Sequence, residues 1–263
     1  MDELSIATDY LESTGDTSGY LKQIAEAGFS HIHWCHQWNT DFLYSASEIK
    51  AIAQDLSDYG LILLDLHGSA GSEKQWGSSI EYKRLAGVEL VQNRIEMTAE
   101  LGSSVVIMHL PTEVEWDSMR KSLDSLEPLC RKQGVRLAIE NGNFTNIRKV
   151  FSEYDPSFIG LCYDCGHGNV AGDGLDRLEE TMERLLSIHL HDNDGTGDQH
   201  SILFSGTVVW EQLAGIIAGS SYSGCVSMEL NMKKSGFEDE TLFLKEAFRT
   251  GTEFSLMIEK AKG

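Results

Sequence analysis

The chain has 263 residues, and 41 acidic against 21 basic residues give it a formal net charge of −20. Such an acidic chain repels phosphate, which argues against a nucleic-acid-binding protein, and a content of 41% hydrophobic residues argues against a disordered one. The length allows one large domain or two small ones, and about 250 residues is the usual size of an α/β barrel.

Targeting and redox features point to the cytoplasm. No apolar run approaches the roughly 18 residues that a membrane span requires. The first ten residues, MDELSIATDY, start acidic and lack the basic and apolar regions of a signal peptide. The five cysteines are an odd and scattered set, as expected for reduced thiols. We therefore expect a cytoplasmic protein without a membrane segment.

Short apolar runs alternate with longer amphipathic segments along the whole chain. We expect strands at about 4–10, 31–35, 61–68, 104–110, 135–141, 158–164, 187–193 and 224–231. Helices are expected between and after them, at about 15–28, 47–60, 79–102, 117–134, 145–154, 176–185, 208–221 and 239–260. Alternation of this kind implies parallel strand pairing, because each crossover helix returns the chain in the same direction.

Eight strand–helix units in this length favour an α/β fold, a single (β/α)8 TIM barrel that spans residues 1–263. The alternative is an open, doubly wound sheet. A GxGxxG turn after the first strand would favour that alternative, but the segment there reads ESTGDTSG.

The expected strands end in polar residues, although strands buried on both faces are ordinarily rich in Val, Ile and Leu. Active sites of such barrels collect at the carboxyl ends of the strands. Six of the eight strands therefore deliver metal-competent side chains to one rim. These residues are His67, His109, Glu140, Asp164 with His167, His189 with His191, and Glu229.

Strand parity selects a smaller group that faces the barrel axis. Glu140, Asp164, His191 and Glu229 converge there from the last four strands. Two glutamates, one aspartate and one histidine form a mixed oxygen and nitrogen cage that suits a divalent ion. His189 lies one layer below His191 and is interpreted as a core residue.

The ordered set of strand-end motifs resembles the xylose isomerase-like TIM-barrel superfamily. The motifs are AIEN with Glu140, CYDCGH with Asp164 and His167, HLHDN with His191, DQH with Asp198 and His200, and SMEL with Glu229. This superfamily joins sugar and sugar phosphate isomerases and epimerases with apurinic endonucleases of the endonuclease IV type. The resemblance extends from about residue 20 to residue 231.

For the epimerase branch, the resemblance implies one Mn, Mg, Co or Zn ion on Glu140, Asp164, His191 and Glu229, with proton transfer by the two glutamates. For the endonuclease branch, it implies three zinc ions. Their ligands would be His67, His109, Glu140, Asp164, His167, His191, Asp198, His200 and Glu229. All nine positions are filled, so additional ions at the His67/His109 and His167/Asp198/His200 positions stay open.

The composition of the expected rim loops favours the epimerase branch over the endonuclease branch. They carry aromatic and acidic residues but one lysine, Lys74, whereas a protein that follows a phosphate backbone needs several basic residues. Trp34, Trp38 and Trp76 could stack on a sugar face, although Trp34 could equally pack against a helix. Many epimerases of the superfamily carry an arginine shortly after the HDN motif, and the segment DGTGDQH has none.

The sequence therefore predicts a metal-dependent isomerase or epimerase of a sugar, sugar phosphate or polyol. Glu140 and Glu229 would act as base and acid, and His167 would bind a substrate hydroxyl or a second ion. The alternative is a zinc phosphodiester hydrolase acting on abasic DNA. A dehydratase and a non-catalytic metal-binding scaffold also stay open. We expect a small-molecule substrate and no nucleic-acid or membrane partner, and a homodimer is compatible with the fold.

Overall fold

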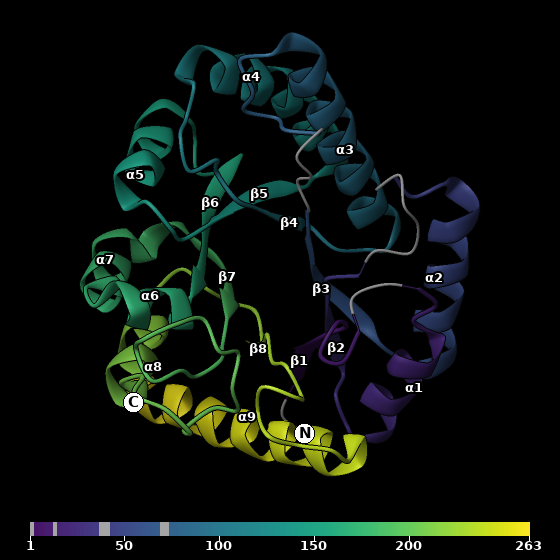
Figure 1. Ribbon diagram of the computed structural model, residues 1–263, viewed down its shortest axis with the longest axis vertical. Coiled ribbons are helices and arrows are strands. Elements are labelled where there is room, and N and C mark those ends of the chain that lie inside the picture. Colours follow the sequence, from purple (N-terminus) through teal and green to yellow (C-terminus); the bar gives the residue numbers. More distant parts are fainter. Residues whose placement is uncertain (1–2, 13–14, 37–42, 69–73) are drawn as a thin grey trace.

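Eight parallel strands surround one axis and helices surround the strands, as the computed structural model shows (Figure 1). It describes residues 3–12, 15–36, 43–68 and 74–263. The strands are β1 (Leu4–Ala7), β2 (His31–Trp34), β3 (Ile62–His67), β4 (Val105–Met108), β5 (Arg136–Glu140), β6 (Ile159–Asp164), β7 (Leu185–His189) and β8 (Val226–Met228). Each pairs with its neighbour in the chain from β1 to β7, and β1 also pairs with β8.

The barrel closes between its last two strands. Leu190, just after β7, forms a parallel bridge with Met228 of β8, and the backbone N–H of Leu190 donates to Ser227 O at 3.0 Å. Every strand pairing is parallel. The predicted (β/α)8 TIM barrel is therefore confirmed.

The helices lie outside the strands (Figure 1). They are α1 (Ser18–Glu26), α2 (Ala46–Tyr59), α3 (Glu81–Glu100), α4 (Trp116–Gln133), α5 (Phe144–Glu153), α6 (Cys165–Ala171), α7 (Gly174–Thr181), the 3-10 turn η1 (Met182–Arg184), α8 (Trp210–Gly219) and α9 (Glu240–Lys262). None of the helices in the described parts of the chain combines the length and the hydropathy of a membrane span.

Helix α2 illustrates how local sequence sets the boundaries. Ser45 caps its start, because the Ser45 hydroxyl accepts from the backbone N–H of Glu48 and the Glu48 carboxylate accepts from that of Ser45. The helix ends at Gly60, whose φ of 68° is a left-handed conformation that other residues rarely adopt. The predicted stop at Gly60 is therefore confirmed.

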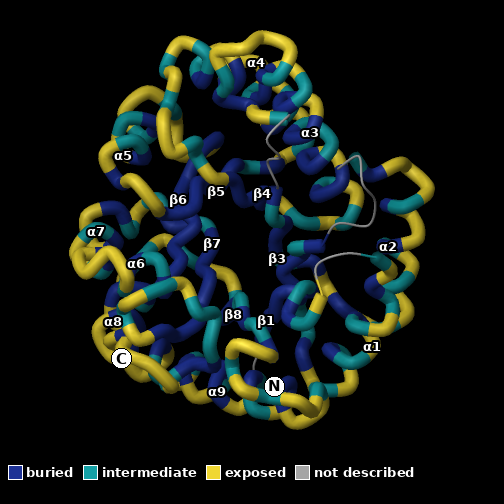
Figure 2. Tube along the Cα trace, viewed as in Figure 1, coloured by how far each residue is buried: buried dark blue, intermediate teal, exposed yellow. Residues whose placement is uncertain are grey.

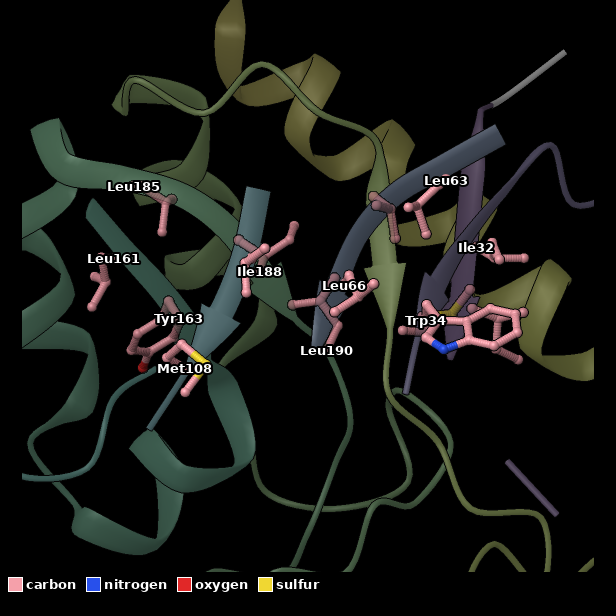
Figure 3. Packing of buried hydrophobic residues seen from close by; sticks show 14 of the residues in the cluster. Ile32, Trp34, Leu63, Leu66, Met108, Leu161, Tyr163, Leu185, Ile188 and Leu190 are labelled. Carbon is pink, nitrogen blue, oxygen red and sulfur yellow. The ribbon is translucent and has the colours of Figure 1, made fainter. Parts of the chain in front are cut away.

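Two apolar layers hold the barrel together. The larger layer lies between strands and helices, and the strands are largely buried (Figure 2). Side chains of this layer such as Leu63, Leu161 and Leu185 are fully or nearly buried (Figure 3). Inside the barrel, a small cluster of Val105, Ile107, Ala138 and Cys162 fills the space. The remaining interior positions are largely polar, which leaves room for chemistry at the carboxyl ends of the strands.

Two elements differ from the sequence-based expectation. Most strands are shorter than expected, so His109 and Glu229 lie just beyond β4 and β8. Helix α6 was not expected, because its sequence CGHGNVA contains two glycines and has little helical periodicity. The Asp164 carboxylate starts this helix by accepting the backbone N–H of His167 at 2.6 Å.

Candidate metal centre

Glu140, the last residue of β5, lies at the centre of a ring of imidazoles. One carboxylate oxygen lies 3.2 Å from His67 Nε2 and 3.1 Å from His109 Nε2, and the other lies 3.4 Å from His167 Nδ1. Burial alone would raise the pKa of the Glu140 carboxyl. The positive charge of His189 and hydrogen bonds from neighbouring imidazoles outweigh burial and bring that pKa well below its usual range. Glu140 is therefore an anion that lies among potential metal ligands.

A group of four donor atoms lies in the mouth of the barrel, all within 4.8 Å of one another. They belong to Glu140, Asp164, His189 and Glu229. The sequence-based set had His191 in place of His189. The strand register explains the difference, because Asp164 pairs directly with His189 and β7 ends there, so His191 lies two residues further along the chain.

The contact between His189 and Glu229 has the geometry of two ligands of one cation. His189 Nδ1 lies 2.6 Å from Glu229 Oε2, yet neither ring nitrogen of His189 has a hydrogen-bond partner among the described residues. Burial alone would lower the pKa of His189, but the proximity of the Glu229 carboxylate raises it, so without a bound cation the positive charge of the His189 ring compensates that carboxylate. The mixed carboxylate and imidazole set therefore fits a divalent ion.

His191 belongs to a neighbouring group with Asp198 and His200. The His200 Nε2 atom lies 2.9 Å from Asp198 Oδ2, and His191 Nε2 lies 3.5 Å from Asp198 Oδ1. His167 Nε2 also approaches Asp198 Oδ2, at 3.6 Å. The structure thus brings together the predicted residues His167, Asp198 and His200, with His191 beside them.

The charges in this neighbouring group are strongly coupled. Burial would lower the pKa of His167, but hydrogen bonding to Asp198 and the charges of Asp164 and Glu140 raise it to about 10. Burial likewise opposes protonation of His200, whereas Asp198 and Glu229 raise its pKa to about 9. Without a bound cation, imidazolium ions balance the carboxylates, and a divalent ion would take over that charge.

Backbone carbonyls fix which nitrogen of two imidazoles faces the acids. His200 Nδ1 lies 2.9 Å from Glu229 O, and His67 Nδ1 lies 3.3 Å from Gly68 O. Because a carbonyl only accepts, each Nδ1 carries a proton and each Nε2 is directed at a carboxylate. Anchoring of this kind is the usual support of a metal-binding histidine.

A third group contains the predicted ligands of β3 and β4. His67, His109 and Glu140 have donor atoms within 4.8 Å of one another, so Glu140 belongs to two groups at once. Burial lowers the pKa of His109, although the Glu140 charge opposes this effect. The structure therefore brings all nine residues suggested as ligands into or beside these groups, with His189 rather than His191 in the four-donor set.

The structure contradicts the expected sugar-stacking role of two tryptophans. Trp34 is 1% exposed, and its indole N–H donates to the Tyr44 hydroxyl at 3.2 Å. Trp76 is also 1% exposed and donates to His109 O at 3.2 Å. Neither ring can present a face to a ligand, because both are packed in the core. Trp38 lies outside the described residues.

Sequence reasoning noted His189 at a strand end but interpreted it as a core residue, and it did not select His33 of β2 or Asp9 after β1. His33 shares a donor group with His189 and Glu229. Burial, followed by repulsion from Glu229, raises the pKa of the Asp9 carboxyl. The sequence offered a signal for His33, because it lies two residues after His31 and on the same face of β2. It offered none for Asp9, which follows a strand without any motif.

A cleft of about 490 Å³ opens beside the donor groups. Its polar wall comes from the donors His109, Glu140, His167 and Asp198 and from three asparagines, and its apolar wall includes Val170. Among the described residues that line it, there is no lysine or arginine. A neutral or weakly charged polar molecule is the ligand that such a cleft suits best.

Several known proteins are similar to this chain in sequence or in fold. The chain is 29% identical over 253 residues to an uncharacterized protein of Sinorhizobium fredii, with 81% of each chain covered. It is 26% identical over 187 residues to "Probable endonuclease 4" of Mycobacterium leprae, covering 62% of this chain and 71% of that protein. A solved structure of a D-tagatose 3-epimerase-like protein superposes with a TM-score of 0.79, at 21% identity, over 98% of this chain and 99% of that one.

A family model, described as xylose isomerase-like TIM barrel, matches residues 21–247. The match covers most of the chain, and it includes the strand ends that carry the donor groups described above. The chain belongs to the xylose isomerase-like TIM barrel family.

Proposed function

We propose that the protein is a divalent-metal-dependent epimerase or isomerase of a sugar or polyol. One observation carries the proposal: Glu140 and Glu229 approach the same atom, His189 Nδ1, at 3.5 Å and 2.6 Å, and the cleft beside them is lined by amides. Two glutamates at one metal-competent centre are the groups needed to move a proton on a carbon next to a carbonyl. The shared barrel of a D-tagatose 3-epimerase-like protein is consistent with this proposal.

Glu140, Asp164, His189 and Glu229 would hold the ion. A Zn, Mn, Mg or Co ion would polarise the substrate's carbonyl and hydroxyl oxygens and so acidify the adjacent C–H bond. One glutamate takes the proton from that carbon, and the other returns a proton to the opposite face. The carbon thereby inverts, and the protons taken and returned balance.

The two glutamates are held differently, which suggests different tasks. The Glu140 side chain is 2% exposed and is surrounded by three histidines, whereas the Glu229 side chain is 14% exposed and follows the end of β8. A carboxylate in contact with several cations is a poor base. We therefore assign the first proton abstraction to Glu229 and the opposite face to Glu140.

Solvent deuterium exchange tests this assignment. The protein is loaded with Mn²⁺ or Co²⁺ and incubated in D₂O with a panel of ketoses, ketose phosphates and keto-polyols, and proton NMR follows deuterium at carbons next to the carbonyl. We expect exchange on at least one substrate for the native protein. Glu229→Gln and Glu140→Gln should each reduce exchange by at least about a hundredfold, the range of general acid–base contributions.

Glu253→Gln is the matched control, because this residue lies on α9 and its side chain is 54% exposed. It should exchange at the native rate. The proposal fails if no member of the panel exchanges, or if either site variant keeps the native rate on a substrate that does exchange.

A second candidate function is a multi-zinc phosphodiester hydrolase. It is favoured by one observation: three further or overlapping donor groups surround the four-donor set, including His67/His109/Glu140 and His191/Asp198/His200. The similarity to a protein named as an endonuclease is consistent with it. The described cleft residues lack the cations that would hold a phosphate backbone.

Elemental analysis and a cleavage assay separate the two candidates. The hydrolase requires about three zinc ions per chain and cleavage of a duplex with one abasic site. The epimerase requires one tightly bound ion and no such cleavage. Three ions together with cleavage would replace the first proposal by the second.

A further inference from the structure

His33 is a buried imidazole inside the barrel that the two-glutamate chemistry does not use. It belongs to β2, is 0% exposed, and pairs in register with Asp65 of β3. Its Nδ1 lies 2.7 Å from Asp65 Oδ1. The other oxygen of Asp65 accepts a hydrogen bond from the Ser187 hydroxyl of β7. The Asp65 carboxylate is therefore held from two sides and fixes the ring of His33.

Both oxygens of the Asp65 carboxylate have a partner, one the Ser187 hydroxyl and the other the Nδ1 atom of His33. A carboxylate anion only accepts, so the proton in the pair lies on Nδ1 of His33. With the proton on Nδ1, Nε2 is the ring nitrogen that can offer a lone pair to a cation.

The Nε2 atom of His33 has no hydrogen-bond partner among the described residues. A buried polar atom without a partner destabilises the folded protein. The ring lies against the centre described above: its centroid is 4.5 Å from that of His189, and donor atoms of His33, His189 and Glu229 lie within 4.8 Å of one another. The surroundings of His33 are therefore those of an unused ligand rather than of a satisfied core residue.

We propose that His33 is a metal-binding residue, whose Nε2 forms with His189 and Glu229 a second donor set that overlaps the four-donor set. The ion then has two adjoining positions that share His189 and Glu229, one toward Glu140 and Asp164 and one toward β2. Asp65 is a positioning residue, because it acts on the ion only through the His33 ring. This inference rests on the proposed metal centre and not on the sugar chemistry.

The arrangement matches how proteins support imidazole ligands. A ligating histidine usually donates its other N–H to a carboxylate, and loss of that outer partner typically costs 10–100-fold in metal affinity. The Asp65–His33 pair has this form, with the free nitrogen directed away from the carboxylate. A purely structural histidine would instead have a partner on both nitrogens.

Cobalt binding tests the proposal without any assay of turnover. Metal-free protein is titrated with Co²⁺ against a competing chelator, and visible absorption reports both affinity and ligand field. We expect His33→Gln to weaken Co²⁺ binding at least tenfold and to change the absorption bands. Asp65→Asn should weaken binding by about 10–100-fold, the usual cost of losing an outer partner.

His31→Gln is the matched control, because it changes a histidine of the same strand, two residues earlier, that contacts Ser30. It should leave Co²⁺ affinity and absorption unchanged. As a second measurement, independent of how the variants fold, ¹⁵N–¹H NMR of histidine-labelled native protein should show the His33 Nε2 resonance moving to a metal-bound position when Zn²⁺ is added.

The proposal would be overturned if His33→Gln kept the native Co²⁺ affinity and absorption. It would also be overturned if the His33 Nε2 resonance did not shift when Zn²⁺ is added. A loss of turnover in His33→Gln with unchanged Co²⁺ binding would also overturn it and would make His33 a substrate contact. If the native protein binds the ion through His33 but exchanges no substrate proton, only the proposed sugar chemistry fails.

Discussion

Strand β6 separates two regions with different tasks. Leu161 and Tyr163 point outward and belong to the large apolar layer beneath the helices, whereas Cys162 and Asp164 point to the barrel axis. All four are buried, so burial does not distinguish them. The outer layer excludes water from a large apolar surface, while the inner layer leaves polar atoms to be satisfied by one another or by an ion. The outward face of this strand therefore contributes to stability, and its inward face provides the candidate ligands.

The largest expected effect comes from Asp164→Asn, which removes one anionic donor from the inner layer. The amide oxygen can still cap α6, where Asp164 accepts from His167 N–H, so the fold should be kept. We expect divalent-ion affinity to fall by more than about a hundredfold, beyond the usual cost of losing only an outer partner. Competition with a chelator measures the change. An affinity within tenfold of the native value would contradict the assignment.

Leu161→Ala tests the outer layer of the same strand. The side chain is 0% exposed, and its truncation should lower the free energy of unfolding by about 2–5 kcal/mol. Metal affinity should stay at the native value, because the residue faces the helices. Urea denaturation in the presence of chelator measures stability without a contribution from ion binding. If metal affinity falls as far as in Asp164→Asn, the two layers are not separable.

The smallest expected effect concerns His31, at the opposite end of β2 from the donor groups. Burial lowers its pKa, and Glu3 only partly opposes this. The unfolded chain therefore binds a proton at His31 more readily than the folded chain does. The contribution of His31 to stability is complete above the unfolded pKa of about 6.5, and it is lost as pH falls from there through the lower folded pKa. His31→Gln should therefore flatten the decrease of unfolding free energy between pH 7.5 and pH 5.5. Equal pH profiles in both proteins would contradict this.

Much of the fold was predictable because it depends on short-range patterns. Eight apolar runs, separated by amphipathic helices and glycine stops such as Gly60, define the barrel almost without reference to tertiary contacts. The polar strand ends were predictable for the same reason, since the carboxyl ends of parallel strands must share one rim. Glu140, Asp164 and Glu229 indeed lie together there.

The remaining features depend on distances that a pattern does not contain. The choice between His189 and His191 required the register of β7 against β6, because both residues have the same parity. Trp34 alternates with His33 and so faces outward, but only the packing with Tyr44 shows that its ring is inaccessible. The Asp65–His33 pair joins two strands whose relative shift includes a register irregularity between Ile32 and His33.

Gly166 in α6 limits how this protein could be re-engineered. A Cβ atom at that position would lie 1.9 Å from Cε1 of His191, so any other residue would displace an imidazole of the Asp198 group. The cleft wall contributed by Leu110, Ile147 and Val170 carries no such restriction, because these side chains are not in the donor groups. A library that seeks new substrates should therefore vary those three positions and keep the glycine that follows Cys165.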